Sequence, residues 1–387
     1  MTRQTHGLTR RPPLHLGVHI DGAGRHPAAW RVAGAQPHRL FSADYYVEIA
    51  QLAERGLLDF VALEDSFKLE SNETDHVRGK LDALLTMARI APVTSSIGLV
   101  ATVTTTHTEP FHVSKNIATL DFVSAGRAGW SVDVSSSEAE AFHFGRRQAA
   151  PSADLYDESA EAIEVVRQLW DSWEDDAVIR DVASGRYIDR SRLHYTNFEG
   201  RHFSVRGPSI TPRSPQGQSL VFFEAVNDDA LAAAIRGADV IVVDVASIDA
   251  ARAMRERIDV GLVAAERDPA EVSMIAVVDV LLGDSDDAAR AARRQLDSLA
   301  APLPAVLDFV GTADGLVGLF AEWAGRDVVD GFVIRPATLP GTLERVVAEV
   351  VPQLQARGLF RTAYDTGTLR ERFGLQRPAN RYAGVTR

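Results

Sequence analysis

The sequence predicts an α/β protein, specifically a (β/α)8 TIM barrel with insertions. Eight short apolar segments occur along the chain, and each is followed by a segment whose apolar residues have helical spacing. The apolar segments are mostly continuous, which indicates strands buried on both faces of a parallel sheet covered by helices. Eight such units fit a closed barrel. An open doubly wound sheet is disfavoured, because residues 22–28 (GAGRHPA) after the first strand lack a G-x-G-x-x-G and open no helix.

The length of 387 residues could accommodate two or three domains, but barrels of this size are commonly one domain. We therefore expect a single barrel domain over residues 1–387, with an insertion at about 135–218 and a C-terminal tail at about 360–387. A hydrophobic fraction of 45% and a charged fraction of 24% suit a globular protein with a large core.

Composition also limits the compartment and the partners. The chain has no cysteine, which excludes disulfides and cysteine nucleophiles and fits a reducing, cytoplasmic compartment. The start of the chain lacks the apolar run of a signal peptide, and no stretch reaches the ~18 apolar residues of a membrane span. The net charge of −12 argues against binding to nucleic acid or an anionic membrane, because both are polyanions.

The first part of the chain supplies four predicted strands, at 14–20, 58–66, 96–103 and 128–134. Helices are predicted between them at 43–56, 80–90 and about 112–124, the first ended by Gly56 and the second by Pro92. The pattern then changes to a polar loop at 135–150, a long amphipathic helix at 153–173 and a charged, Gly/Pro-rich segment with short β-like pieces at 174–218.

The strand–helix alternation resumes in the second part of the chain. Strands are predicted at 219–226, 239–246, 272–283 and 330–337. Two of the helices that follow have a candidate N-cap, Asn227 and Ser285, and another is expected at about 312–324. Residues 338–360 form the last main helix, and the amphipathic tail at 364–375 is expected to pack on the outside.

The carboxyl ends of the strands indicate where the site lies, because barrels of parallel strands handle small molecules at that end. We expect one polar pocket with few cations there, lined by His19 and Asp21, Glu64 and Asp65, Thr102 to His107, Ser131 to Ser137, Glu224 and Asn227, Asp244, Asp279, and Arg335.

Several chemistries are possible for such a pocket. A metal ion could be held by His19, Asp21, Glu64 and His107, although no H-E-x-x-H pair supports it. A glycosidase could use Glu64 and Glu224, but the strand ends supply few aromatic walls. A serine hydrolase is disfavoured because no G-x-S-x-G occurs.

Three segments carry a specific resemblance. They are residues 96–130 (SIGLVATVTTTHTEPFHVSKNIATLDFVSAGRAGW), residues 201–225 (RHFSVRGPSITPRSPQGQSLVFFEA), and residues 330–375, which include VVPQLQARGLFRTAY and TLRERFGL. Together they resemble the bacterial-luciferase-like flavin monooxygenases, in the branch of the nitrilotriacetate, dibenzothiophene-sulfone and long-chain-alkane monooxygenases. The resemblance runs from about residue 14 to 375, and it implies a luciferase-like (β/α)8 barrel with insertions.

The resemblance also implies an activity. Members of this family take reduced FMN (FMNH2) from a separate flavin reductase, activate O2 at the flavin and oxidise a small organic substrate. The protein holds the flavin, excludes water and positions the substrate. A homodimer or homotetramer is the expected assembly.

Site residues follow from the resemblance position by position. Asp65 stands where the family has an acidic flavin contact, and Thr102 and Ser131 stand beside the isoalloxazine ring, Ser131 in place of a family asparagine. Tyr156 matches a tyrosine that contacts the cofactor, and Ser152 replaces a frequent histidine. The candidate catalytic group is His107, which could hydrogen-bond the substrate or a flavin peroxide. His19 and His143 are weaker candidates.

The chain departs from the family after its fifth strand. The family has a Gly/Ser turn there, roughly Q-A-G-x-S-x-x-G, whose amides hold the FMN phosphate, whereas residues 224–230 read EAVNDDA. A carboxylate ~4 Å from a phosphate charge costs ~4 kcal/mol at an effective dielectric of about 20, roughly a thousandfold in affinity. Either FMN binds through a clamp rebuilt around Asn227 and Asp228, or this member binds a ligand without flavin catalysis. An unrelated barrel hydrolase is the third hypothesis.

Overall fold

The barrel closes through eight parallel strands in the computed structural model, which describes residues 13–68, 76–365 and 367–383. The order around the barrel is β1, β2, β3, β4, β9, β10, β11 and β13, and β13 pairs with β1. These strands are β1 His15–Ile20, β2 Phe60–Leu63, β3 Gly98–Thr104, β4 Ala128–Asp133, β9 Leu220–Glu224, β10 Val240–Val243, β11 Ser273–Leu282 and β13 Gly331–Pro336. The predicted (β/α)8 barrel and its eight strands are confirmed.

A further strand, β12 Asp308–Gly311, was not predicted. It pairs with the last residues of β11, Asp279 to Leu282, on the side where β11 extends past its barrel neighbours. Because β12 has only four residues inside a connecting segment, the sequence gives it no clear strand pattern.

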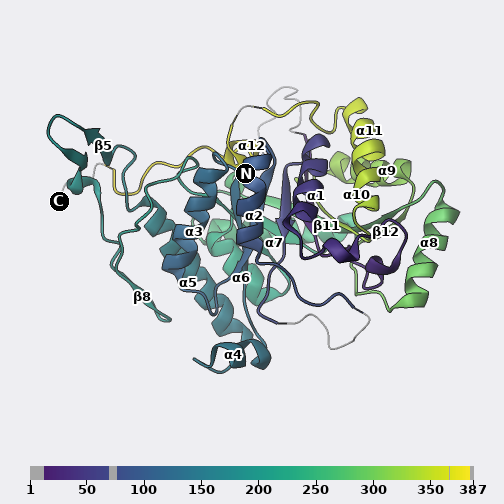
Figure 1. Ribbon diagram of the computed structural model, residues 1–387, viewed down its shortest axis with the longest axis horizontal. Helices are drawn as coiled ribbons and strands as arrows, with labels where there is room; N and C mark the ends of the chain where they lie inside the picture. The colour runs from purple at the N-terminus through teal and green to yellow at the C-terminus, as the bar shows by residue number, and fades with distance from the viewer. Residues whose placement is uncertain (1–12, 69–75, 366, 384–387) are drawn as a thin grey trace.

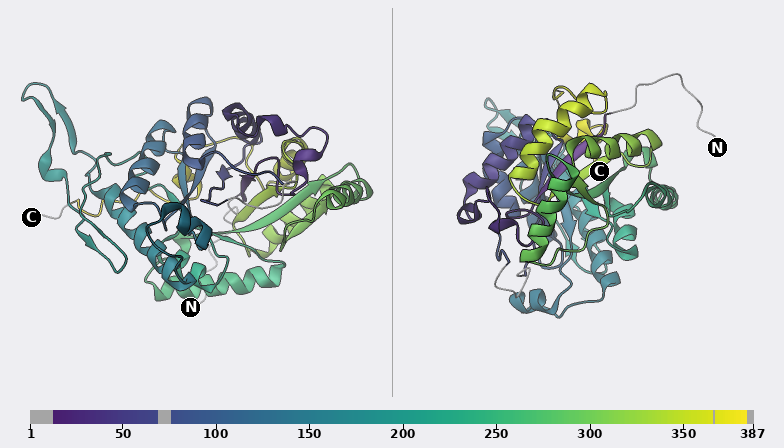
Figure 2. Two further views of the ribbon diagram at one scale, coloured as in Figure 1. Left: turned by 60° about the horizontal axis from the view of Figure 1, so that its bottom comes forward. Right: turned by 90° about the vertical axis from the view of Figure 1, so that its right-hand side faces the viewer.

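Helices surround the barrel (Figures 1 and 2). They are α1 Ala43–Arg55, α2 Ala83–Ile90, α3 Pro110–Val123, α5 Ser152–Asp171, α6 Asp228–Gly237, α7 Ile248–Ala264, α8 Asp286–Leu299 and α9 Ala313–Arg326. The caps predicted at Asn227 and Ser285 are confirmed, since each side chain accepts a backbone N–H three residues on. The helix predicted at 338–360 is divided into α10 Gly341–Arg345, a π-helical turn Val346–Val350 and α11 Val351–Ala356. The division lies just before Pro352, which cannot donate an intrahelical hydrogen bond.

The polar loop predicted at 135–150 is wrong, because this segment contains a helix, α4 Glu138–Phe144. Ser137 and Glu140 form a reciprocal capping box at its start, and Gly145 ends it with a φ of 62°. The serine and glutamate three residues apart, Ser137 and Glu140, were the sequence signal that could have predicted this helix start.

The segment expected as an insertion contributes to the helical ring as well as to the periphery. Its long helix α5 packs between α3 and α6. Two small hairpins follow, β5 Val178–Asp181 with β6 Arg186–Ile188, and β7 Phe198–Glu199 with β8 Ser204–Val205. The β5–β6 hairpin extends away from the barrel (Figures 1 and 2).

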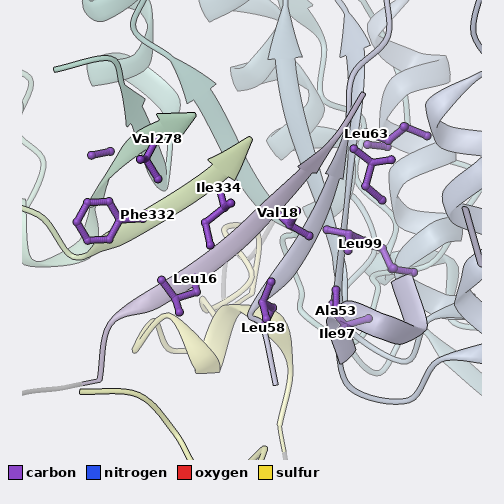
Figure 3. Close-up of a cluster of buried hydrophobic side chains, with 14 of the residues drawn as sticks. Leu16, Val18, Ala53, Leu58, Leu63, Ile97, Leu99, Val278, Phe332 and Ile334 are labelled. Carbon is purple, nitrogen blue, oxygen red and sulfur yellow. The ribbon is translucent and has the colours of Figure 1, made fainter. Parts of the chain in front are cut away.

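The core has two layers. The larger one lies between strands and helices, where Leu16, Val18, Leu99, Phe332 and Ile334 are fully buried (Figure 3). The smaller one fills the barrel interior and includes residues from every barrel strand but β1 and β4, among them Phe60, Val100, Phe222 and Val333.

The C-terminal tail belongs to the inner layer, so the prediction that it packs on the outside is wrong. Leu369 in α12 (Leu369–Arg372), Phe373 and Leu375 are buried in the barrel-interior cluster. The ring of Phe373 stacks on that of His15, with centroids 4.1 Å apart. The amphipathic pattern was interpreted correctly as one buried face, but that face closes the amino-terminal end of the barrel, opposite α4 (Figure 1).

No helix among the described residues is long and apolar enough to cross a membrane.

Candidate functional site

A cavity of about 390 Å³ opens at the carboxyl ends of the barrel strands. Its floor is apolar, and its walls are polar. The floor residues include Phe60, Val100, Phe222, Val242 and Val333, and the wall residues include His19, Glu64, Thr102, Ser131, Asp133, Glu224, Asp244 and Arg335. The prediction that polar strand ends meet in one pocket is therefore confirmed for these wall residues.

Strand periodicity explains this layering. Successive side chains of a strand point to opposite faces, so residues two apart both point into the barrel. On β9, Phe222 lies in the floor and Glu224 in the wall, and on β13 Val333 and Arg335 repeat the arrangement. The same pairing of an inner apolar residue with a polar residue at the mouth occurs on β3, with Val100 and Thr102, and at the end of β10, with Val242 and Asp244.

Two arginines are held on one side of the cavity. Nε of Arg335 donates to Oδ1 of Asp279 at 2.6 Å, and its Nη2 lies 3.5 Å from Oδ1 of Asp244. Arg25, from the loop after β1, reaches the same Asp279 carboxylate at 4.0 Å. Arg25 was not predicted as a cavity residue, because a loop residue has no strand periodicity that fixes the direction of its side chain.

Carboxylates and one histidine make up much of the remaining polar wall. Burial and the nearby Asp244 raise the pKa of Glu224 to about 7, although Arg335 acts against this shift. Burial also raises the pKa of Asp133 to about 6. Burial lowers the pKa of His19, so its ring is neutral at pH 7. Near neutral pH the cavity therefore holds carboxylates that are easily protonated and an uncharged imidazole.

Three of the residues assigned to the cofactor by resemblance come together here. Thr102 and Ser131 are register partners on β3 and β4, and both line the cavity. Tyr156 reaches it from the first turns of α5. Burial raises the pKa of the Tyr156 hydroxyl to about 12, so the hydroxyl stays protonated and can donate a hydrogen bond.

Asp65 and Ser152 lie outside this lining. The Asp65 carboxylate accepts the backbone N–H of Ala83 at 2.9 Å, at the start of α2, and that of Ser66 at 2.8 Å. Ser152 is exposed as the first residue of α5. These contacts indicate a structural role for Asp65, whose carboxylate supports the N-terminus of α2.

The candidate catalytic His107 also lies outside the cavity lining. Its ring stacks on Phe144, with centroids 4.5 Å apart, and is near Phe67. The preceding threonines fasten the end of β3 to the segment after β4: Thr104 hydrogen-bonds Ser135 at 2.9 Å, and the Thr106 hydroxyl accepts the Ser135 N–H.

Asn227 and Asp228 lie at the start of α6. Asn227 Oδ1 accepts the Ala230 N–H at 2.8 Å, and its side chain also interacts with the Tyr156 hydroxyl. The exposed Asp228 carboxylate points toward α7, where Arg257 donates to it at 2.7 Å. Asp228 is therefore turned away from the cavity.

A smaller hollow of about 240 Å³ adjoins the main cavity, with Arg25 and Glu64 common to both. Trp30, Leu40 and Tyr46 give it an aromatic and aliphatic wall. Within the described part of the chain, no three His, Asp or Glu side chains are arranged to hold a metal ion.

A closed parallel barrel with a cavity at the carboxyl ends of its strands is the arrangement of TIM-barrel enzymes that act on small molecules. The chain belongs to the luciferase-like monooxygenase family, whose model matches residues 22–354. It is 33% identical to N-acetyl-S-(2-succino)cysteine monooxygenase of Bacillus subtilis (strain 168), over 97% of this chain and 99% of the relative. It is 31% identical to nitrilotriacetate monooxygenase component A of Aminobacter aminovorans, over 96% and 98%.

The fold agrees with the crystal structure of a long-chain alkane monooxygenase, with a TM-score of 0.86 and 24% identity over 94% of this chain and 96% of that one. Membership identifies the chain as a flavin-dependent monooxygenase. Glu64 and Glu224, the pair considered for a glycosidase, both line the cavity of this oxygenase fold.

The lining residues fit the ring system of a flavin. A cavity of this size is within the usual range for small-molecule sites, about 300–1,000 Å³. Phe60, Val100 and Phe222 offer an apolar surface, and the hydroxyls of Thr102 and Ser131 offer hydrogen bonds at its edge.

Proposed function

We propose that this chain is the oxygenase component of a two-component system, which uses reduced flavin from a separate flavin reductase to oxidise a small organic substrate with O2. The observation that carries the proposal is the meeting of Thr102, Ser131 and Tyr156 in one cavity at the strand ends. The word "component" in the name of the nitrilotriacetate relative supports a system of more than one protein.

The bound flavin would supply the oxygen activation, and the protein would supply binding, orientation and exclusion of water. Thr102 and Ser131 would hold the polar edge of the ring, with Phe222 beneath it. Arg335 is fixed by Asp279 and so presents a positive charge in a defined position. The neutral His19 can accept or donate one hydrogen bond in the same cavity.

The adjoining hollow is the proposed substrate chamber. Its wall of Trp30, Leu40 and Tyr46 suits an apolar part of the substrate, and Arg25 stands where the two cavities meet. Burying the substrate beside the flavin would keep water from the reacting atoms.

Anaerobic titration with FMN and riboflavin, each oxidised and photoreduced, tests the proposal. We expect binding of a reduced flavin in the micromolar range, weakened about tenfold or more by Thr102→Val combined with Ser131→Ala, because two buried hydrogen bonds are lost. Ser152→Ala is the matched control, because Ser152 is exposed and lies outside the cavity. The flavin affinity of this variant should equal that of the unchanged protein. No binding of either flavin at high micromolar concentration would favour the alternative, a family member that binds a ligand without flavin catalysis.

A further inference from the structure

Every α-helix from α1 to α10 carries a carboxylate of its own at its N-cap or in its first turn. Helix N-termini are ordinarily good sites for phosphate, because free N–H groups and the helix dipole favour negative charge. A carboxylate already occupies each of these N-termini: Asp44 in α1, Asp82 in α2, Glu109 in α3, Glu138 in α4, Asp154 in α5, Asp229 in α6, Asp249 in α7, Asp286 in α8, Asp314 in α9 and Glu344 in α10. A phosphate would therefore meet like charge at each of these helix N-termini.

The groove between α5 and α6, which runs from Tyr156 away from the cavity, is no better suited to a phosphate. A hollow of about 150 Å³ lies there, lined by Tyr156, Asp157, Asp229 and Arg236. Arg236 donates to Asp157 at 2.7 Å, so its charge is already neutralised. Asp229 is half-buried and close enough to Tyr156 to add to the rise in its pKa.

The cavity side of α6 offers no replacement. Val226 lines the mouth with an apolar side chain, and Asn227 already uses its carbonyl oxygen to cap the helix. The nearest wall residue along the chain is Glu224, at the end of β9, and its carboxylate would repel an anion once ionised. Of the two cavity arginines, Arg335 is hydrogen-bonded to Asp279, and Arg25 lies 4.0 Å from the same carboxylate, so each cation already faces an anion.

We infer that this chain binds the flavin through its ring and ribityl chain without a phosphate clamp, so that riboflavin binds at least as tightly as FMN. The inference rests on the proposed flavin-dependent function and specifies its cofactor. A carboxylate ~7 Å from a phosphate charge, at an effective dielectric of about 20, corresponds to roughly a fiftyfold loss of affinity before screening by salt. Screening by salt reduces this loss, so we expect the affinity for riboflavin to be equal to that for FMN or up to about tenfold higher.

The test compares the dissociation constants of riboflavin and FMN. Binding of the oxidised flavins is measured by fluorescence quenching, and binding of the photoreduced flavins is measured by absorbance under anaerobic conditions. Riboflavin binding as tightly as FMN or more tightly supports the inference. FMN binding more than threefold more tightly overturns it and leaves the proposed function standing. Binding of neither flavin overturns both.

A variant pair tests the role of Asp229. Asp229→Asn is expected to tighten FMN about tenfold and leave riboflavin unchanged, because only FMN carries the repelled charge. Asp249→Asn is the matched control, since it removes the same charge from the first turn of α7, where Asp249 is exposed and paired with Arg252. An equal effect of both variants on FMN, or an unchanged FMN affinity in Asp229→Asn, would contradict the assignment.

Discussion

Removing Phe373 gives a quantitative test of the barrel closure by the C-terminal tail. Its side chain is 6% exposed, stacks on His15 and lies 5.9 Å from the ring of Phe222. Hydrogen-bonded strands surround this position, so the space left by Phe373→Ala cannot collapse easily. Truncation of a buried phenylalanine costs about 3–5 kcal/mol. For a chain of this length, that loss corresponds to a fall in Tm of about 4–6 °C.

Urea unfolding followed by circular dichroism and tryptophan fluorescence would measure this loss. Phe142→Ala is the matched control, because it removes the same atoms from a side chain that is 84% exposed on α4. The control should change the free energy of unfolding by less than about 0.5 kcal/mol. A loss below about 1 kcal/mol for Phe373→Ala, or equal losses for both variants, would refute the view that the tail seals the barrel.

Three further predictions concern the mouth of the barrel. The pKa of Glu224 is raised from 4.5 to about 7, so the folded protein binds more protons than the unfolded chain between these values and loses stability as the pH rises through them. Glu224→Gln should therefore raise Tm more at pH 8 than at pH 4.5, and an equal effect at both would contradict the shift. Asp228→Ser should leave FMN affinity unchanged, because this carboxylate is paired with Arg257; tighter binding in a flavin titration would show that it reaches the cavity. Asn227→Ala should cost about 1 kcal/mol in urea unfolding through loss of the α6 cap, and a change below about 0.3 kcal/mol would argue against that cap.

The fold could be predicted because its signals are local and repeated. Continuous apolar runs show burial on both faces, and the caps at Asn227 and Ser285 were visible as residue types at helix starts. Helix α4 was missed because its seven residues are too few for a clear periodicity, and its capping box was the one remaining signal. The C-terminal tail shows the limit of periodicity. An amphipathic pattern predicts that one face of the segment is buried, but it does not predict which part of the protein covers that face.

The site was only partly predictable for a related reason. Thr102 and Ser131 lie within strands, whose alternation fixes the direction of each side chain. Asp65 and His107 lie just past their strands, where the chain turns and alternation no longer applies. The structure places Asp65 at the start of α2 and His107 against Phe144, both through contacts between distant parts of the chain that no local pattern encodes.

The pairing of β1 with β13, from His15 opposite Gly331 to Val18 opposite Ile334, has a consequence for synthesis of the chain. More than 300 residues separate the two strands, and at ribosomal rates of about 5–20 residues per second the first strand waits roughly 15–60 s for its neighbour. During that time one side of β1 offers unpaired amides and carbonyls to any other nascent strand. Chaperone protection of the amino-terminal half during translation should therefore affect yield more than the stability of the finished barrel would suggest.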